Sequence, residues 1–314
     1  MPPTDAEDQA VTIRDCLIVG GGPAGLTAAL YLARFLLTVM LVDAGNSRAA
    51  LIPLTRNHAG FPDGITGPEL LSRMRLQANR YGADLREGEV DRLERQPDGS
   101  FLVFSDRATV RARTVLLATG VVNRRPPLID DRTHALALAS GQLRYCPICD
   151  GYEVKDRAVA VLGTGQRGCD EAIFLRSYTA DVTLVAPDIS HDLSPGQLSE
   201  LVDAGIQLET RCTAIELCGH QIVLTLPGGP RGFDSLYPAL GSDIRSELAR
   251  QVGAEMSDDG CLTVDAHQRT SVTGLYAAGD VVLGLDQISH AMGEGGVAAT
   301  AIRNDLARRT PLLR

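Results

Sequence analysis

Short apolar runs alternate with amphipathic stretches along this chain of 314 residues. The runs contain few polar positions, which is typical of strands that a parallel sheet buries on both faces. They lie at residues 16–19, 38–42, 114–120, 158–162, 182–185 and 274–280. Helices are predicted between them, ending near residues 36, 81, 178, 204 and 306. This alternation of strand and helix predicts an α/β fold.

A glycine-rich turn follows the first apolar run and predicts a dinucleotide site. It reads Gly20-Gly21-Gly22-Pro23-Ala24-Gly25 and leads directly into the first predicted helix. Glycines at these spacings permit a tight turn, the approach of a pyrophosphate and close packing of helix on strand. Asp43 ends the second run about twenty residues further on, where an acidic side chain binds a ribose hydroxyl.

The same pattern occurs a second time, which predicts a second domain of the same kind. The run at residues 158–162 leads into Gly163-Thr164-Gly165-Gln166-Arg167-Gly168. Residues 124–127 are interpreted as a linker before it, and residues 239–241 as a second crossing between domains. We predict two Rossmann-like three-layer domains, the second inserted into the first. The first comprises residues 1–120 and 242–314, and the second comprises residues 121–241.

Shorter patterns predict further elements around this frame. Val90 is expected to end a strand, and residues 101–104 and 109–110 are expected to form part of an antiparallel layer. Thr66 with Glu69, and Ser194 with Gln197, have the spacing of a capping box. Each pair therefore predicts the start of a helix.

The sequence Cys146-Pro147-Ile148-Cys149-Asp150 carries the candidate chemistry. In the first turn of a helix, this spacing brings both sulfurs close enough to bond. Free N–H groups and the partial positive charge of a helix N-terminus favour a thiolate. Asp150 can exchange protons beside the sulfurs, as thiol–disulfide exchange requires. The alternative is half of a structural zinc site, but the other five cysteines offer no second Cys-x-x-Cys pair.

Composition narrows the class of protein. The net charge is −9 and no basic run stands out, which argues against nucleic acid and anionic membrane as partners. Seven cysteines without a regular framework fit a reducing compartment, and the acidic residues 1–9 are unlike a signal peptide. Glycines and Arg34 interrupt the apolar stretch 17–42, so no membrane span is predicted there. We expect a cytoplasmic enzyme without a metal, since the histidines have no ligand spacing.

The order of these motifs resembles the low-molecular-weight thioredoxin reductase family of flavoproteins. The series runs from the first glycine turn with Asp43 through Ala118-Thr119-Gly120, the cysteine motif and the second glycine turn to Gly279-Asp280. The resemblance covers nearly the whole chain. It implies FAD on the first domain, a redox-active cysteine pair on the second, and a homodimer.

The resemblance also implies roles for individual residues. Cys146 would exchange with the substrate, Cys149 would contact the flavin, and Asp150 would be the acid–base residue. The start of a helix at Gln287 would face the pyrimidine edge of the flavin. The positions implied to bind FAD are Gly20, Gly22, Pro23, Ala24, Asp43, Asn57, Val90, Gly120, Gly279, Asp280, Gln287 and Ile288.

One departure from the family affects the expected nicotinamide nucleotide. Members that use NADPH carry a His-Arg-Arg run after the strand that corresponds to residues 182–185, whereas this chain has Ala186-Pro187-Asp188. An aspartate repels a 2′-phosphate, and a proline offers no donor. Three cases stay open: NADH, weak use of NADP(H), and no nicotinamide. The departure points toward a branch that resembles the thioredoxin-reductase-like dithiol oxidases.

These features support three hypotheses for function. The favoured one is oxidation of a small-molecule dithiol to a disulfide, with electrons passing through Cys146 and Cys149 to FAD and then to oxygen or NAD(P)+. The alternative is reduction of a thioredoxin-like protein by NAD(P)H or another donor. The third is a non-catalytic redox sensor, against which Asp150 and the intact cysteine pair argue. His58 and His290 are interpreted either as proton relays or as hydrogen-bonding partners of FAD or the backbone.

Overall fold

The computed structural model describes residues 13–313, and its contacts divide the chain into two compact units. The first contains Met1–Ala49, Leu70–Val121 and Ile244–Arg314, and the second contains Ala50–Glu69 and Val122–Asp243. The second unit thus interrupts the first along the sequence. Its contacts also include residues 50–69, which the sequence-based boundaries give to the first domain. Those exact boundaries stay a prediction.

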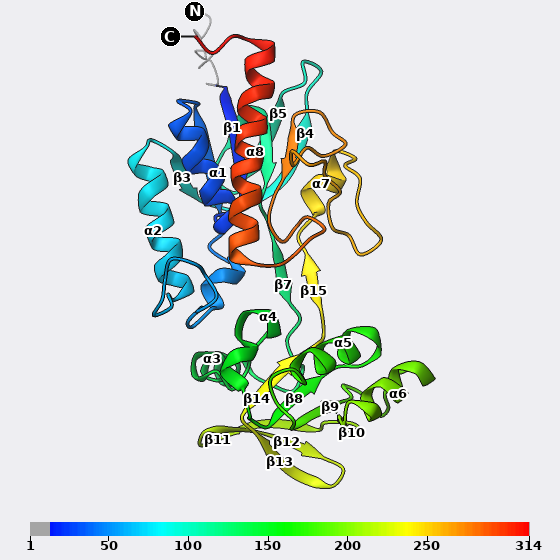
Figure 1. Ribbon diagram of the computed structural model, residues 1–314. Helices are drawn as coiled ribbons and strands as arrows, with labels where there is room; N and C mark the ends of the chain where they lie inside the picture. Colours follow the sequence, from blue (N-terminus) through cyan, green and yellow to red (C-terminus); the bar gives the residue numbers. More distant parts are fainter. Residues whose placement is uncertain (1–12, 314) are drawn as a thin grey trace, which may run out of the picture. The chain divides into compact units, whose positions relative to one another are not determined.

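The first unit is built on a seven-stranded sheet (Figure 1). Its strand order is β3-β2-β1-β6-β5-β4, with β16 alongside β6. The strands β4 and β5 are antiparallel to their neighbours, and the others pair in parallel. The strands are β1 Arg14–Val19, β2 Val39–Asp43, β3 Asp84–Glu87, β4 Val90–Arg95, β5 Phe101–Ser105, β6 Thr109–Leu117 and β16 Leu275–Ala277.

Strand β6 changes its partner along its length, which the sequence pattern did not reveal. Its first half pairs with β5 in antiparallel register, where Phe101 lies opposite Ala112. Its second half pairs with β16 in parallel register, where Leu275 lies opposite Val115. The predicted strands at 109–110 and 114–120 are therefore one continuous strand. Val90 begins β4 and does not end a strand as predicted, because the chain turns between residues 87 and 90.

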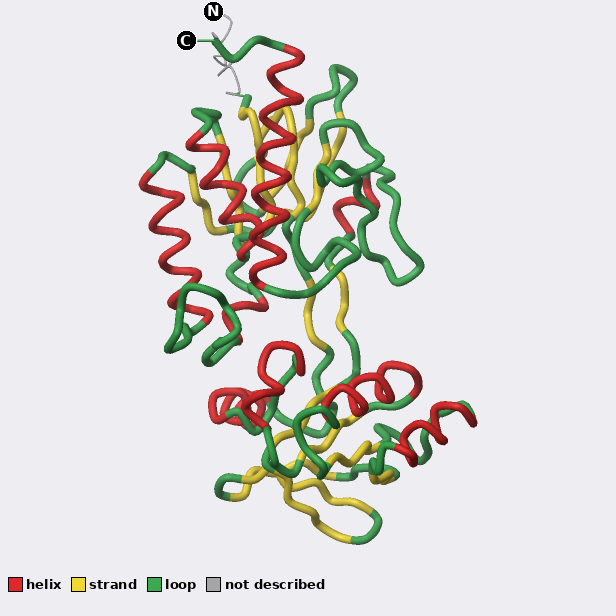
Figure 2. Tube along the Cα trace, in the orientation of Figure 1, coloured by secondary structure: helices red, strands yellow, loops and turns green. Residues whose placement is uncertain are grey.

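Helices α1 and α8 pack together beside this sheet, as Figures 1 and 2 show. Small residues permit the close approach: a Cβ on Gly295 of α8 would collide with the carbonyl oxygen of Ala24 in α1. Four helices contribute to the first unit: α1 Pro23–Arg34, α2 Gly67–Arg80, α7 Glu247–Gln251 and α8 Ile288–Arg309. Within residues 13–313, no helix combines the length and the apolar character that crossing a membrane requires.

The second unit has three layers around a parallel sheet of order β10-β9-β8-β14. Alternate residues of β8 enter different apolar clusters: Val159 and Val161 pack with α5 and α6, while Ala160 and Leu162 pack with a three-stranded antiparallel layer. This arrangement confirms the predicted three-layer α/β class. Its elements are β8 Val159–Leu162, α5 Gly165–Leu175, β9 Val182–Val185, α6 Pro195–Asp203, β10 Gln207–Glu209, β11 Ala214–Cys218, β12 Gln221–Leu226, β13 Gly229–Phe233 and β14 Ser235–Pro238.

The sequence predicted some features of the second unit and missed another. Helix α6 begins with the predicted capping box of Ser194 and Gln197. Helix α3 (Asp131–Ser140) was not predicted, although Asp130 caps it by accepting a hydrogen bond from the Thr133 N–H. The expected linker lies at the end of β7 (Val121–Asn123), which pairs with β15 (Ser242–Ile244) where the chain returns.

We expect Phe101→Ala to destabilise the first unit far more than Phe104→Ala. The two residues lie on opposite faces of β5. Phe101 is fully buried, whereas the partly exposed ring of Phe104 lies under the Arg92 guanidinium, 3.7 Å from its Cζ. Removing a buried ring costs about 3–5 kcal/mol of unfolding free energy. Urea unfolding followed by circular dichroism measures both variants, and equal losses would contradict the predicted packing of β5.

Candidate active site

Cys146 and Cys149 form a disulfide in the second unit, with their Cα atoms 5.2 Å apart. Cys146 is the N-cap of α4 (Pro147–Asp150), and Pro147 takes the first helical position as predicted. The N–H of Cys149 donates to Cys146 Sγ over 3.2 Å and to the Cys146 carbonyl oxygen over 2.9 Å. Because α4 is a single turn, these local N–H groups, and not a long helix dipole, are what the turn offers a thiolate.

The cysteine turn is accessible from solvent. Ile148, between the two cysteines, is half exposed, and Tyr152 just beyond is 77% exposed. Both cysteines are partly buried. An incoming thiol can therefore reach the turn while its other side stays packed, as disulfide exchange requires.

Asp150 is anchored behind the cysteines by two polar partners. Its Oδ2 accepts from Arg144 Nη1 over 2.9 Å, and its Oδ1 accepts from the Tyr237 hydroxyl over 2.9 Å. Burial raises the pKa of Asp150 above its ordinary value, and the Arg144 charge opposes this shift. The result is a carboxyl group next to Cys149 that gives up its proton less readily than an exposed one.

A second hydrogen bond reaches the turn from α3. His134 Nε2 lies 2.8 Å from the hydroxyl oxygen of Tyr145, the residue before Cys146. Burial lowers the pKa of His134, so its imidazole is biased toward the neutral form. Burial also raises the pKa of Tyr145 to about 12, which keeps its hydroxyl protonated.

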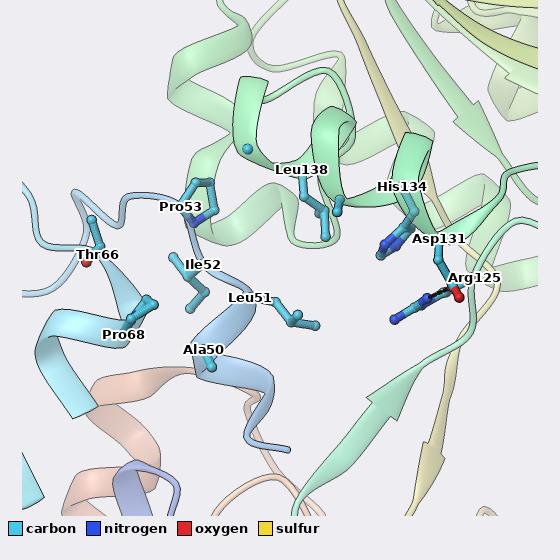
Figure 3. A pocket seen from close by; sticks show the side chains of 12 residues that line it. Ala50, Leu51, Ile52, Pro53, Thr66, Pro68, Arg125, Asp131, His134 and Leu138 are labelled. Carbon is cyan, nitrogen blue, oxygen red and sulfur yellow. Dashed lines mark hydrogen bonds and ion pairs between the residues drawn. The ribbon is translucent and has the colours of Figure 1, made fainter. Parts of the chain in front are cut away.

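His134 also lines a cavity of about 670 Å³ within the second unit. Figure 3 shows His134, Asp131 and Arg125 on one side of it and the segment Ala50–Pro53 on another. Most of its lining is apolar, and Arg125 Nη1 pairs with Asp131 Oδ1 at 2.7 Å. A few polar groups in an apolar wall are typical of small-molecule sites.

The first glycine turn has the tight geometry that its sequence predicts. Gly20 has φ +107°, and a Cβ on Gly25 would collide with the carbonyl oxygen of Gly20. By contrast, a Cβ on Gly22 would meet the Ser47 hydroxyl at 3.3 Å and no backbone atom, so only a side chain approaches this side of the turn. The turn therefore provides a cradle at the start of α1 with the N–H groups that a pyrophosphate needs.

Asp43 lies directly beside this turn. Its Oδ1 accepts from the Gly21 N–H over 3.1 Å, and its Oδ2 forms an ion pair with Arg75. The side chain is buried at the end of β2, in the place expected of a ribose-binding acid. In the structure it braces the glycine turn, and its contact with a ribose stays a prediction.

The end of β16 brings further predicted positions to the same turn. A Cβ on Gly279 would stand 2.9 Å from the Cβ of Ala24, so these two positions are neighbours. Asp280 Oδ2 accepts from Arg48 Nη1 over 3.1 Å, and burial raises the pKa of Asp280. Gln287 is the N-cap of α8, without a side-chain capping hydrogen bond, and Ile288 is the first helical residue.

Three further predicted positions have other contacts. Gly120 follows β6 with φ +64°, and its carbonyl oxygen accepts from the Arg245 N–H. Val90 begins β4, where it pairs with Ser105. Asn57 Oδ1 accepts from the Thr55 hydroxyl, and its segment belongs to the second unit by contacts.

The loop that follows β9 is hydrogen-bonded to the second glycine turn. Asp192 donates its N–H to Thr164 Oγ1 over 2.6 Å, and a Cβ on Gly165 would be 3.6 Å from the Asp192 carbonyl oxygen. Gln197 Nε2 donates to Gln166 Oε1 over 2.9 Å. Strand β9 is followed by Ala186, Pro187 and Asp188. The exposed carboxylate of Asp188 therefore stands where basic residues would be expected to bind a 2′-phosphate.

Comparison with known proteins accounts for these features together. The pyridine nucleotide-disulphide oxidoreductase family matches residues 14–295. The thioredoxin reductase of Mycolicibacterium smegmatis is 35% identical over 285 residues, which cover 86% of this chain and 89% of that protein. The structure of thioredoxin reductase from Streptococcus pyogenes MGAS5005 has a TM-score of 0.87 at 25% identity, over 95% of this chain and 100% of that one. The structure of HlmI has a TM-score of 0.87 at 28% identity, over 94% of this chain and 93% of that one.

The chain belongs to the pyridine nucleotide-disulphide oxidoreductase family. Within that family it is a flavoprotein oxidoreductase acting on sulfur groups, and the predicted resemblance to low-molecular-weight thioredoxin reductases is confirmed. The named relatives favour the reductase alternative over the dithiol oxidation that the sequence pattern favoured. The dithiol oxidase branch stays a prediction.

The first unit of this family member fits FAD. The tight turn of Gly20 and Gly25, the N-terminus of α1 and the N-cap of α8 at Gln287 are the kind of cradle that a dinucleotide with a flavin requires. The segment 287–290 also carries one predicted histidine: His290 Nε2 lies 3.1 Å from Glu294 Oε1. The other, His58, stacks on Phe61, and burial lowers its pKa.

Sequence reasoning missed the residues that surround Asp150. Arg144 precedes the cysteine motif by two positions, and Tyr237 lies on β14, a strand without a recognisable spacing pattern. A local signal existed only for Arg144, as a basic residue beside a reactive cysteine pair. Among residues 13–313, no group of three histidine, cysteine, aspartate or glutamate side chains is arranged to hold a metal.

We expect Gly25→Ala to lower the amount of flavin that copurifies with the chain at least about tenfold, because the added methyl group displaces the Gly20 backbone from the cradle. Gly293→Ala on α8 is the matched control, since its Cβ would meet nothing within 4 Å. Visible absorbance per chain measures the bound flavin. A fully loaded Gly25→Ala protein would contradict the cradle.

Proposed function

We propose that this flavoprotein is a disulfide reductase of the thioredoxin reductase type, with FAD as its flavin and Cys146–Cys149 as its exchange site. The observation that carries the proposal is the disulfide at an accessible turn, directly followed by a partly buried carboxyl group whose pKa is raised. A zinc ligand pair or a packing disulfide needs no such carboxyl group. Relatives named thioredoxin reductase support a thioredoxin-like protein as the partner.

The residues proposed to hold FAD are those that form or border the cradle of the first unit, together with the family positions Asn57 and Val90. When bound, FAD supplies a two-electron carrier. The proposed contacts are Gly20, Gly22, Pro23, Ala24, Asp43, Asn57, Val90, Gly120, Gly279, Asp280, Gln287 and Ile288.

The exchange itself needs only the cysteine pair and its proton donor. With the pair reduced, Cys146 as thiolate attacks the partner's disulfide and forms a mixed disulfide. Cys149 then attacks Cys146 Sγ, which restores the Cys146–Cys149 bond and gives both electrons to the partner. Asp150 delivers a proton to the leaving thiolate, and its hydrogen bonds from Arg144 and Tyr237 hold it in place for that transfer.

Oxidation of a small dithiol is a second candidate, and two observations favour it. The loop after β9 is hydrogen-bonded to the second glycine turn and carries Asp188 in place of a basic clamp. The cavity beside His134 has the size of a small-molecule site and is one hydrogen bond away from Tyr145. In this direction the substrate thiolate attacks Cys146, and its second thiol closes the product disulfide.

We expect Cys146→Ser and Cys149→Ser each to lower electron transfer to a bacterial thioredoxin by about a thousandfold, because serine cannot form the exchanging disulfide. The protein is first reduced anaerobically with dithionite and then mixed with oxidised thioredoxin, whose new thiols are counted. Cys218→Ser, at an exposed free cysteine, is the control. Retained transfer in Cys149→Ser would rule out the proposed exchange site.

We expect NADH to bleach the flavin at least about tenfold faster than NADPH under anaerobic conditions, because Asp188 repels a 2′-phosphate. Asp188→Arg reverses this preference, while Asp203→Arg, which adds the same charge on α6, leaves it unchanged. Stopped-flow absorbance measures both rates. Fast bleaching by NADPH in the unaltered chain would overturn the role given to Asp188. Bleaching by dithiothreitol but by neither nucleotide, with recovery in air, would favour the dithiol oxidase.

A further inference from the structure

The turn that follows β16 lies beside Ala24 of the first glycine turn. Gly279 has φ +80°, a backbone conformation that side chains rarely adopt, and a Cβ there would stand 2.9 Å from the Cβ of Ala24. The hydrogen bonds to β6 end just before it, where the Ala278 N–H donates to the Leu117 carbonyl oxygen. The sheet therefore fixes the backbone as far as Ala278, and another group has to hold the N–H of Gly279.

Glu294 of α8 provides that group. Its Oε2 accepts from the Gly279 N–H over 2.6 Å, across 15 residues of sequence. Gly279 is buried and only 11% of the Glu294 side chain is exposed, so water competes little for this hydrogen bond. A hydrogen bond from a backbone N–H to a carboxylate is shorter and stronger than one between neutral groups. Losing this acceptor leaves a buried N–H without its partner.

The packing of α8 brings Glu294 to this position. Gly295, the next residue, comes so close to α1 that a Cβ would collide with the carbonyl oxygen of Ala24. One turn earlier on α8, the Cβ of Ala291 would lie 3.6 Å from a Cβ on Gly279. The helix is therefore held on both sides of residue 294, which keeps its carboxylate at the turn.

His290 occupies the other oxygen of Glu294. Its Nε2 lies 3.1 Å from Glu294 Oε1, one helical turn away, and its side chain is 42% exposed. A partly exposed pair of this spacing contributes little energy, but it orients the carboxylate toward the turn. Glu294 is thus the link between the helix and the backbone of Gly279.

The side chain of Asp280 is held separately from the backbone before it. Arg48 Nη1 donates to Asp280 Oδ2 over 3.1 Å and to Asp286 Oδ2 over 2.8 Å. Arg48 restrains the carboxylate of Asp280, while Glu294 restrains the backbone that carries it. The two restraints act on different atoms, so a change at Glu294 leaves the Arg48 ion pairs available.

We propose that Glu294 is a positioning residue for FAD: through the Gly279 N–H it holds the backbone that presents Gly279 and Asp280 to the cofactor. The inference rests on the proposed function, in which both of these residues contact FAD. It goes beyond that function because Glu294 is not among the proposed contacts and acts through the backbone of two that are.

The first test measures the affinity of the full-length chain for FAD after its flavin has been removed, by the quenching of flavin fluorescence. We expect Glu294→Ala to raise the dissociation constant at least about tenfold, because a buried N–H loses its acceptor. Glu294→Gln keeps an oxygen acceptor and is expected to stay within about threefold of the unaltered chain. Glu255→Ala, which removes an exposed carboxylate from the same unit, is the matched control. Equal losses in Glu294→Ala and Glu294→Gln would overturn the inference, because the conservative variant then fails to restore the affinity.

Hydrogen exchange at the Gly279 amide reports the hydrogen bond without any flavin. NMR of the full-length chain with isotope-labelled glycine measures this amide, and Gly20, whose N–H donates to the Val42 carbonyl oxygen, is the internal reference. We expect exchange in Glu294→Ala to become at least about tenfold faster at Gly279 and to stay unchanged at Gly20. A general loss of stability accelerates both amides, so the comparison separates positioning from folding.

The outcomes distinguish a failure of this inference from a failure of the proposed function. If Glu294→Ala binds FAD as tightly as the unaltered chain, Glu294 has no positioning role and the inference fails, while the FAD cradle stands. If the unaltered chain takes up no FAD, the proposed function fails and the inference falls with it. If Glu294→Ala does not fold, the unaltered chain still decides: a Gly279 amide that exchanges as fast as an unprotected glycine overturns the inference, and a protected one supports it.

Discussion

The anchoring of one carboxyl group behind an accessible disulfide is the constraint on which the chemistry of this chain depends. Asp150 ends the helical turn that Cys146 begins, so its partners fix the orientation of the whole turn. Arg144 lies six residues before Asp150 in the sequence, whereas Tyr237 comes from β14, 87 residues further on. The sheet of the second unit therefore supports the cysteines from behind, while Ile148 and Tyr152 leave the front accessible.

The two glycine turns show how far one local pattern can differ in its surroundings. At the first turn, buried Asp43 supports the backbone by accepting a hydrogen bond from the Gly21 N–H. At the second, the loop after β9 reaches across and binds Thr164 through the Asp192 N–H. Identical glycine spacing is thus supported by a buried carboxylate in one unit and by a hydrogen-bonded loop in the other. The loop sequence, and not the glycines, distinguishes the two.

Much of this organisation was predictable because it depends on local signals. Both glycine turns, the capping box at Ser194 and the first-turn position of Pro147 follow from residues adjacent in sequence. The continuous strand β6 was not recognised, because its change of partner depends on β5 and β16. Tyr237 was missed for the same reason: a single side chain that contacts a residue far away in sequence has no spacing to detect. The fold class was thus predictable, while the environment of Asp150 was not.

The pairing of β7 with β15 has a consequence for how such a chain can have arisen. The two strands bring the points where the chain enters and leaves the stretch 124–241 next to each other, and the Arg124 N–H donates to the Gly241 carbonyl oxygen. A segment whose ends meet can be inserted into a host by recombination without shifting the register of the host's sheet. The cysteine-bearing stretch thus has the geometry of an inserted segment, whose sequence can change without altering the strand order of the first unit.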